Sequence, residues 1–322
     1  MRVGGLRLGV RSLVGVSLAG ALFGLAVFSV SGCNKSAVDA QKLAKQAQSI
    51  QGEDPKGAAE MYKQAAQMDP TNHKILGNLA VLYERQKDWN NAAETYAKAA
   101  ALDDTYANYQ FRRGYALMEL ALKDPGKAGL DKAKDPLKKA IAKDSHIADA
   151  YYYLGKVHYE LDEEQDALEA LTKAIETRGD QLHYYVELAN IYLNLGLAEQ
   201  GLAVALEGQK IAPQIKFANE NDKIDGVNAW YFLALDEARA AELLNKPDDK
   251  IKALEKTRQI ANPKNGPRDA EYQLALAYAD KGQPQDACQA LAGYLKTPAG
   301  KTVEAQESRK DAEAKKFVWK CP

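Results

Sequence analysis

The sequence is poor in the residues that most catalytic and metal-binding sites require. It has three cysteines and four histidines in 322 residues. No Cys-x-x-Cys, His-Glu-x-x-His, Gly-x-Ser-x-Gly or glycine-rich phosphate loop is present. The acidic cluster Asp162, Glu163, Glu164 and Asp166 lacks the glycine and ligand spacing of a calcium loop, so we interpret it as a solvated turn. We therefore expect no catalytic residues, no metal and no cofactor.

The sequence also lacks an excess of positive charge. It has 43 lysine and arginine residues against 44 aspartate and glutamate residues. Three of the basic residues lie within a predicted signal segment, and without them the balance is 40 basic to 44 acidic residues. We expect no nucleic-acid partner, because no net positive field is available to engage phosphates.

The N-terminus has the layout of a secretory signal. Arg2, Arg7 and Arg11 precede an uncharged run from residue 12 to residue 31, and polarity rises sharply after Cys33. An uncut transmembrane helix is the alternative, because the run approaches the thickness of a membrane.

The residues before this boundary, Val30, Ser31, Gly32 and Cys33, resemble the lipobox of bacterial lipoproteins. The resemblance implies cleavage after Gly32 and attachment of lipid, including a palmitate-type acyl chain, at Cys33. More than one acyl chain would anchor the protein stably. By resemblance to the sorting rule of bacteria with two membranes, Asn34 favours the outer membrane, with the chain facing the periplasm. A lipoprotein of the inner or plasma membrane is the alternative.

Two consecutive blocks between residues 148 and 213 superimpose when the sequence is shifted by thirty-four residues. Large apolar residues match large ones, and small residues match small ones. Each block has the pattern of two helices separated by a short polar turn. Self-similarity at this period indicates a solenoid of stacked helical hairpins.

The first block, with Tyr151, Leu154, Gly155, Ala167 and Leu171, resembles the tetratricopeptide repeat. That pattern has a bulky residue, a leucine and a small residue on the first helix, then alanine and an aromatic residue or leucine on the second. The resemblance implies an all-α fold, a right-handed α-solenoid of stacked hairpins with a C-terminal capping helix. Such a repeat is a scaffold that binds many things, so it says little about function.

The repeat period divides the whole chain. Residues 1–32 form the signal peptide, residues 33–38 the lipidated N-terminus with a short linker, and residues 302–322 the C-terminal cap. The first helix is expected to begin near Asp39. The period is lost from Gln214 to Val227, which we predict to be a long loop or an irregular helix, with the next helix starting at Asn228. The array spans residues 39–301, with units at 39–72, 73–106, 107–145, 148–181, 182–215, 228–263 (degenerate) and 268–301.

In this repeat family the first helices of successive repeats line a concave groove. Tyrosine, lysine and asparagine there would combine apolar area with hydrogen-bonding tips, which suits a peptide or a partner's helix. The alternative is that these side chains only cover the backbone. The resemblance places the following residues in or beside the groove: Phe111, Tyr115, Tyr152, Lys156, Tyr159, His183, Val186, Asn190, Asn194, Tyr272 and Leu276.

Two cysteines remain once Cys33 is assigned to lipid. In an oxidising periplasm they can pair. The family register turns Cys288 toward the C-terminal helix that leads to Cys321. A disulfide between them is one interpretation, and a small core residue with a free thiol near the C-terminus is the other.

These patterns predict a membrane-anchored scaffold that binds an envelope protein or peptide and helps a complex assemble or localise. In layout the chain is similar to the pilotin lipoproteins of type IV pilus secretins. One alternative is a structural protein that self-associates, and the sequence leaves the oligomeric state open. Another is a small-ligand receptor or an enzyme that uses residues 214–227.

Overall fold

The computed structural model describes residues 30–260, 269–296 and 303–322. Within these ranges all regular structure is helical, with fifteen α-helices, α1 to α15, and two short 3-10 helices. This confirms the predicted all-α fold of stacked hairpins. None of these helices is both long and apolar enough to cross a bilayer. Most of the predicted signal segment, residues 1–29, lies outside the described residues.

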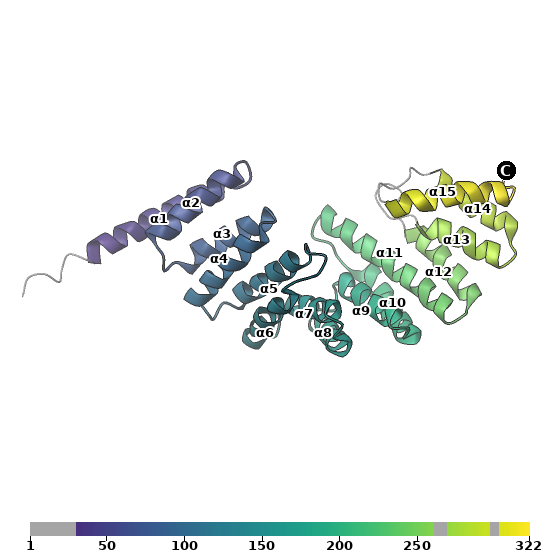
Figure 1. Ribbon diagram of the computed structural model, residues 1–322, viewed down its shortest axis with the longest axis horizontal. Helices are drawn as coiled ribbons and strands as arrows, with labels where there is room; N and C mark the ends of the chain where they lie inside the picture. Colours follow the sequence, from purple (N-terminus) through teal and green to yellow (C-terminus); the bar gives the residue numbers. More distant parts are fainter. Residues whose placement is uncertain (1–29, 261–268, 297–302) are drawn as a thin grey trace, which may run out of the picture. The chain divides into compact units, whose positions relative to one another are not determined.

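The chain divides into two compact units, residues 1–75 and 76–322. In the first unit, helices α1 (Val30–Ile50) and α2 (Pro55–Met68) pack together as a hairpin (Figure 1). Asp54 caps α2 by accepting a hydrogen bond from the backbone of Gly57 at 2.9 Å. The core of the hairpin is formed by Tyr62 and small side chains such as Ala47.

Helix α1 begins well before the predicted start at Asp39, so the predicted linker, residues 33–38, is helical. No glycine or proline interrupts residues 34–38, and the Ser36 hydroxyl donates a hydrogen bond to the Met68 carbonyl at 2.7 Å. Packing against α2 therefore extends the helix through a segment that the repeat pattern does not include.

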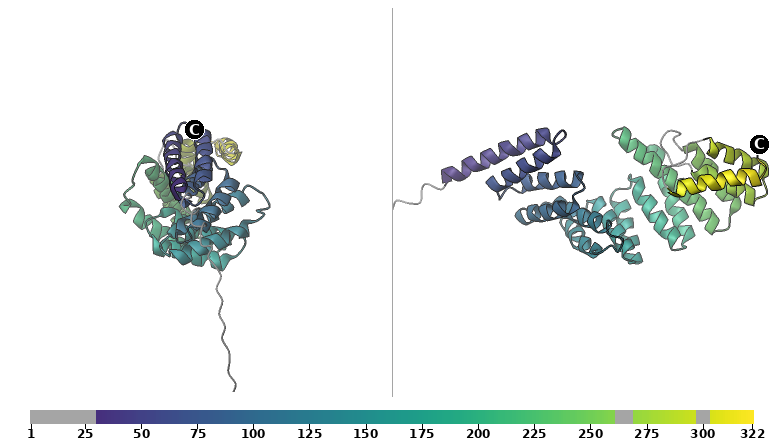
Figure 2. Two further views of the ribbon diagram at one scale, coloured as in Figure 1. Left: turned by 90° about the vertical axis from the view of Figure 1, so that its left-hand side faces the viewer. Right: turned by 45° about the horizontal axis from the view of Figure 1, so that its top comes forward.

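The second unit is a series of helical hairpins, whose partners lie side by side in Figures 1 and 2. Helix α3 (His73–Arg85) begins in the first unit and continues into this one. The following helices are α4 (Trp89–Leu102), α5 (Ala107–Ala121), α6 (Lys134–Lys143), α7 (Ala148–Glu160), α8 (Glu164–Thr177), α9 (Leu182–Asn194), α10 (Ala198–Ile211), α11 (Glu220–Leu243), α12 (Pro247–Ile260), α13 (Asp269–Asp280), α14 (Pro284–Leu295) and α15 (Val303–Val318).

In several hairpins the two helices meet where a glycine on one helix packs against a leucine on the other. A Cβ atom on Gly155 of α7 would lie 2.7 Å from Leu171 Cγ of α8. In the preceding hairpin, a Cβ atom on Gly114 would lie 2.6 Å from Leu137 Cγ. Both leucines are fully buried. A larger residue at either glycine would force the helices apart, which explains why the pattern needs small residues there.

The segment where the period is lost contains more helix than predicted. A 3-10 turn at Ala212–Gln214 leads to a short extended stretch, and α11 then begins at Glu220 instead of Asn228. The Asn219 side chain caps this helix by accepting from the backbone of Asp222 at 3.0 Å. An N-cap residue followed by two acidic residues in the first turn favours a helix start at this point. The repeat register does not include this local preference.

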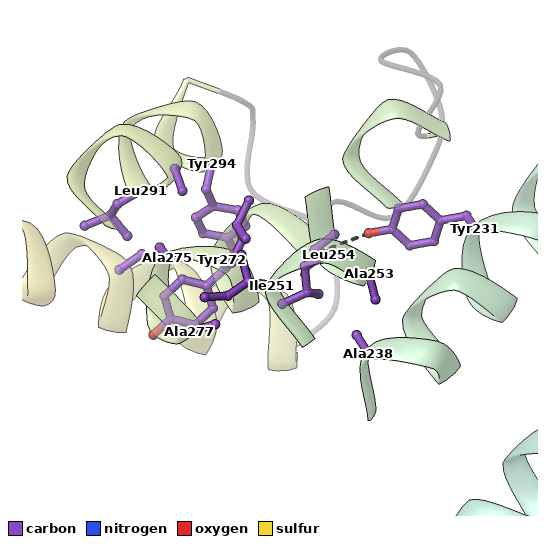
Figure 3. Packing of buried hydrophobic residues seen from close by; sticks show 14 residues of the cluster. Tyr231, Ala238, Ile251, Ala253, Leu254, Tyr272, Ala275, Ala277, Leu291 and Tyr294 are labelled. Atoms are coloured by element: carbon purple, nitrogen blue, oxygen red, sulfur yellow. Dashed lines mark hydrogen bonds between the residues drawn. The ribbon is translucent and has the colours of Figure 1, made fainter. Parts of the chain in front are cut away.

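The C-terminal end is held by a buried cluster that draws residues from α11 to α15 (Figure 3). It includes Leu254 and Leu291, and the Tyr231 hydroxyl accepts a hydrogen bond from the Ala270 backbone at 3.1 Å. Cys288 and Cys321 form a disulfide with their Cα atoms 5.3 Å apart. In the chain-entropy model, closing a loop of this length stabilises the fold by about 4 kcal/mol.

One buried carboxyl group, that of Asp236, lowers the stability of the folded protein when it is ionised. Asp236 on α11 is 5% exposed, and its Oδ2 atom has no hydrogen-bond partner among the described residues. Burial raises the pKa of Asp236 to about 7, although the positive charge of Arg239 partly offsets the effect. The folded pKa is therefore above the unfolded value. Protonated Asp236 therefore favours the folded state in full at pH values below its unfolded pKa. This contribution to stability is lost as the pH rises through the folded pKa, because the ionised carboxylate is costly to bury.

We expect Asp236→Asn to stabilise the protein at about pH 8 and to have little effect at about pH 4. The upper limit of the gain is about 4 kcal/mol, because one pKa unit corresponds to about 1.4 kcal/mol. Thermal unfolding of variant and wild type at the two pH values measures it. Glu207→Gln, an exposed change on the neighbouring helix α10, is the control. An equal gain at both pH values would contradict burial of the charge as the cause.

Candidate functional site

A continuous row of aromatic rings crosses the hairpins of the second unit. We define the aromatic row as Tyr115 on α5, Tyr153 and Tyr152 on α7, and His183 on α9. The ring centroids of Tyr115 and Tyr153 are 4.7 Å apart, those of Tyr153 and Tyr152 are 5.0 Å apart, and those of Tyr152 and His183 are 4.9 Å apart. Trp89 on α4 extends the row with an edge contact to Tyr115 at 5.6 Å.

The inner rings of this region are structural. Tyr152 and Phe111 are only 8% and 7% exposed, and burial raises the pKa of Tyr152 above its ordinary value. Tyr152 also packs on Tyr184 of α9, with centroids 5.1 Å apart. Such aromatic pairs contribute about 0.5–1.5 kcal/mol each beyond area burial. These rings therefore tie neighbouring hairpins together and form the floor of the site.

Polar side chains form the rim of the row. The Lys156 ammonium lies 5.5 Å above the Tyr152 ring centroid and 3.8 Å from the Glu187 carboxylate on the next first helix. Partial burial raises the pKa of Glu187, and the positive charge of Lys156 opposes this. The pair therefore presents a cation and an anion side by side next to an aromatic surface.

A second polar bridge runs along the other end of the same helices. The Asn194 side-chain amide donates to the Tyr159 hydroxyl at 2.8 Å, which joins α9 to α7. Arg239 on α11 donates to the side-chain amide oxygen of Asn194, Oδ1, at 2.7 Å. Three successive first helices are therefore connected by one hydrogen-bonded chain that fixes the spacing between them.

The row ends at a cavity of about 610 Å³ between the start of α9 and the start of α11. Its walls include Leu182 and His183 from α9, and Ile215 and Phe217 from the stretch before α11. The exposed His183 imidazole lines this space. His183 belongs both to the row and to the cavity wall, and it joins the two into one surface.

Gly226 on α11 makes the cavity possible. A Cβ atom at this position would lie 2.1 Å from the Phe217 ring, so the ring can pack on the helix only because the residue is glycine. The acidic residues Asp180, Asp222 and Asp225 line the same cavity together with Arg178 and Lys216. Residues 214–227 are thus organised into the wall of a mixed polar and apolar cavity.

The acidic turn after α7 is bonded, and not simply solvated as predicted. Buried His158 Nδ1 contacts the Glu163 carboxylate and lies 3.8 Å from that of Asp166. These three residues have the donor atoms of a metal site. However, the Lys134 ammonium lies 2.7 Å from Glu163, and it lowers the pKa of Glu163 together with His158. The resident cation already balances the charge, which favours a structural brace.

The structure brings most of the predicted groove residues together and separates two of them. Val186 and Asn190 are half-buried on α9, beside His183. Tyr272 and Leu276 lie on α13, where the Tyr272 hydroxyl donates to Asp311 of α15 as part of the C-terminal packing.

Sequence reasoning missed Tyr153 and Glu187, and it gave residues 214–227, which line the cavity, only as an alternative binding site. The run of three tyrosines at residues 151–153 is the signal that could have identified Tyr153, because more than one helix face is aromatic there. Glu187 had no comparable signal, because its pairing depends on how neighbouring hairpins face each other. For the cavity, the signal was the loss of the repeat period over residues 214–227.

The fold is that of a helical-hairpin repeat protein. Two family models, both described as tetratricopeptide repeat, match residues 49–117 and 129–181, so the chain contains tetratricopeptide repeats. The solved tetratricopeptide repeat protein from Parabacteroides merdae has 14% sequence identity and a TM-score of 0.55, over 87% of this chain and 99% of that one. At this identity the likeness concerns the fold alone.

Two curated relatives share part of the array. Anaphase-promoting complex subunit 3 of Schizosaccharomyces pombe is 28% identical over 141 residues, 44% of this chain and 20% of the relative. The probable UDP-N-acetylglucosamine–peptide N-acetylglucosaminyltransferase SPINDLY of Hordeum vulgare is 31% identical over 152 residues, 46% of this chain and 15% of the relative. The chain thus spans a fifth or less of these relatives. What is shared is a repeat scaffold of the kind that supports protein–protein interaction.

The different burial of floor and rim predicts different effects of mutation. Tyr152→Ala should lower the free energy of unfolding by about 3–5 kcal/mol, because it leaves a cavity among three rings. Lys156→Ala should change it by less than about 1 kcal/mol, because the Glu187 pair is partly exposed to water. Denaturant unfolding of both variants measures this difference. Equal losses would show that the floor and the rim are not distinct.

Proposed function

We propose that the protein is a membrane-anchored scaffold of the bacterial cell envelope that binds an extended segment of a partner protein. The aromatic row with its polar rim and terminal cavity is the observation that carries the proposal. It spans several helices, as an extended polypeptide needs, whereas a small molecule would occupy only one part of it.

The rim side chains can bind a partner segment without a rearrangement of the helices that carry them. Lys156 and Glu187 are held beside each other, so they can pair with the backbone or with charged side chains of a bound segment. Half-exposed Asn190 and exposed His183 supply donors and acceptors on the next helix. Because neighbouring helices are already fixed by hydrogen bonds, binding does not have to order them, which favours affinity.

The cavity at the end of the row suits a single side chain of the partner. Leu182, Ile215 and Phe217 provide apolar contact for a long stem. Arg178 is already engaged by Asp149, with Nη2 3.3 Å from Oδ1, whereas Asp225 has no ion-pair partner among the residues that the structure describes. We therefore favour an aliphatic or aromatic side chain with a polar tip as the occupant.

A small-ligand receptor is the second candidate, because the cavity of about 610 Å³ is large enough for a small molecule. Arg178, which lines the cavity, is paired with Asp149 of α7, and this supports a binding role rather than a catalytic one.

The groove is tested by photo-crosslinking in cells. A photoreactive residue in place of Asn190 should form a defined adduct with one partner. Adding Lys156→Ala and His183→Ala should reduce the yield about tenfold, since each lost rim contact of about 1 kcal/mol weakens binding several-fold. A photoreactive residue at exposed Lys173 on the second helix α8 is the matched control. Equal adducts at both positions would refute a groove on the first helices. An adduct with a small molecule alone would favour the receptor.

The envelope anchor rests on the lipobox resemblance at residues 30–33 and is tested separately. The mature N-terminal peptide should begin at Cys33 and carry a thioether-linked lipid and an acylated amino group, and Cys33→Ser should abolish both. Mass spectrometry of the membrane fraction measures this. An intact segment 1–32 joined to an unmodified Cys33 would contradict lipid anchoring and leave a membrane-spanning signal as the alternative.

A further inference from the structure

The end of α15 exposes two consecutive large apolar side chains. Phe317 is 90% exposed and Val318 is 75% exposed. The other exposed large hydrophobic residues in the described part of the chain range from 37% to 51%. Two neighbouring side chains that are almost fully in water form an apolar tip, which we define as Phe317 and Val318. Exposure of this kind commonly marks an interaction surface.

The tip is presented on a fixed support. Trp319 packs against the C-terminal cluster, and Cys321 is joined to Cys288 on α14. The backbone amide of Trp319 donates to the Lys315 carbonyl at 2.8 Å, and that of Cys321 donates to the Lys316 carbonyl at 3.0 Å. The exposed side chains are therefore held between ordered contacts on both sides of the chain.

The charges around the tip are positive and available. Lys310, Lys316 and Lys320 have no carboxylate partner among the residues that the structure describes, and all three are exposed. The two nearby acids are already engaged: Asp311 accepts from Tyr272 and lies 3.4 Å from Lys315, and Glu313 accepts from Arg309 at 3.1 Å. An apolar tip surrounded by unpaired lysines is complementary to a surface that is anionic outside and apolar beneath.

We propose that the tip of α15 docks into an anionic lipid surface. Phe317 and Val318 enter the boundary between headgroups and acyl chains, and Lys316 and Lys320 contact lipid phosphates. A second copy of the chain fits less well. Two side chains bury far less than the roughly 1,200 Å² that a stable protein interface needs, whereas a lipid surface gains from each added cation.

This contact is distinct from the proposed N-terminal anchor and from the groove. It uses only residues of α15 and the turn that follows. The array would be attached at its C-terminal end as well.

The test places p-benzoylphenylalanine at position 317 of the full chain and reconstitutes it with vesicles. One set of vesicles is phosphatidylcholine, and the other is phosphatidylcholine with anionic phosphatidylglycerol. After illumination, mass spectrometry of the peptide that carries position 317 measures covalent lipid adducts. The same residue in place of Phe232, which is 42% exposed on α11, is the control. Formation of the Cys288–Cys321 bond confirms that each variant folds.

We expect several-fold more lipid adduct at position 317 with anionic vesicles than with neutral ones, and only background at position 232. Lys316→Gln combined with Lys320→Gln should reduce the adduct at position 317 to the neutral-vesicle level. Adducts between two copies of the chain, or equal lipid labelling at positions 317 and 232, would overturn the proposal. Neither result would bear on partner binding at Asn190, so failure here is separable from failure of the proposed function.

Discussion

The close approach of paired helices is the constraint on which the second unit depends. Leu171 reaches the backbone of α7 only because residue 155 is glycine, and Leu137 meets Gly114 in the same way. When each hairpin closes at this distance, its remaining apolar face is left for its neighbours. One hairpin cannot bury that face alone, so the hairpins stack and the stack produces a row of first helices.

The tyrosines on this row contribute to stability, and we propose that the side chains above them contribute to recognition. Tyr152 is buried against Tyr153, Tyr184 and His183, so it joins hairpins much as a core residue does. Lys156 and Glu187 lie above it, within reach of water. The surface that a partner would meet is therefore made by the rim, and the rings beneath keep the rim residues at a fixed spacing. Loss of binding after a ring substitution would by itself say little about recognition.

The C-terminal end of the array differs from the other repeats, because a single helix covers it. The last repeat is covered by α15, which the cluster around Leu291, the Tyr272–Asp311 hydrogen bond and the Cys288–Cys321 bond hold in place. Covering the end protects the apolar face that another repeat would otherwise bury. The same helix presents Phe317 and Val318 outward. A cap that only completed the core would have no need of an exposed phenylalanine among lysines.

Local periodicity determined the helices, the turns between them and the all-α stack, because the spacing of Leu154, Gly155, Ala167 and Leu171 specifies which faces meet within one hairpin. It failed at two helix starts, where the contact of Ser36 with α2 and the Asn219 cap decided the outcome. Only the tertiary structure revealed that Tyr153 makes the aromatic row continuous, that Lys156 pairs with Glu187, and that a cavity lies beside Gly226. These depend on how one hairpin faces the next. That geometry is set by contacts between residues about thirty or more positions apart, which a repeat pattern does not encode.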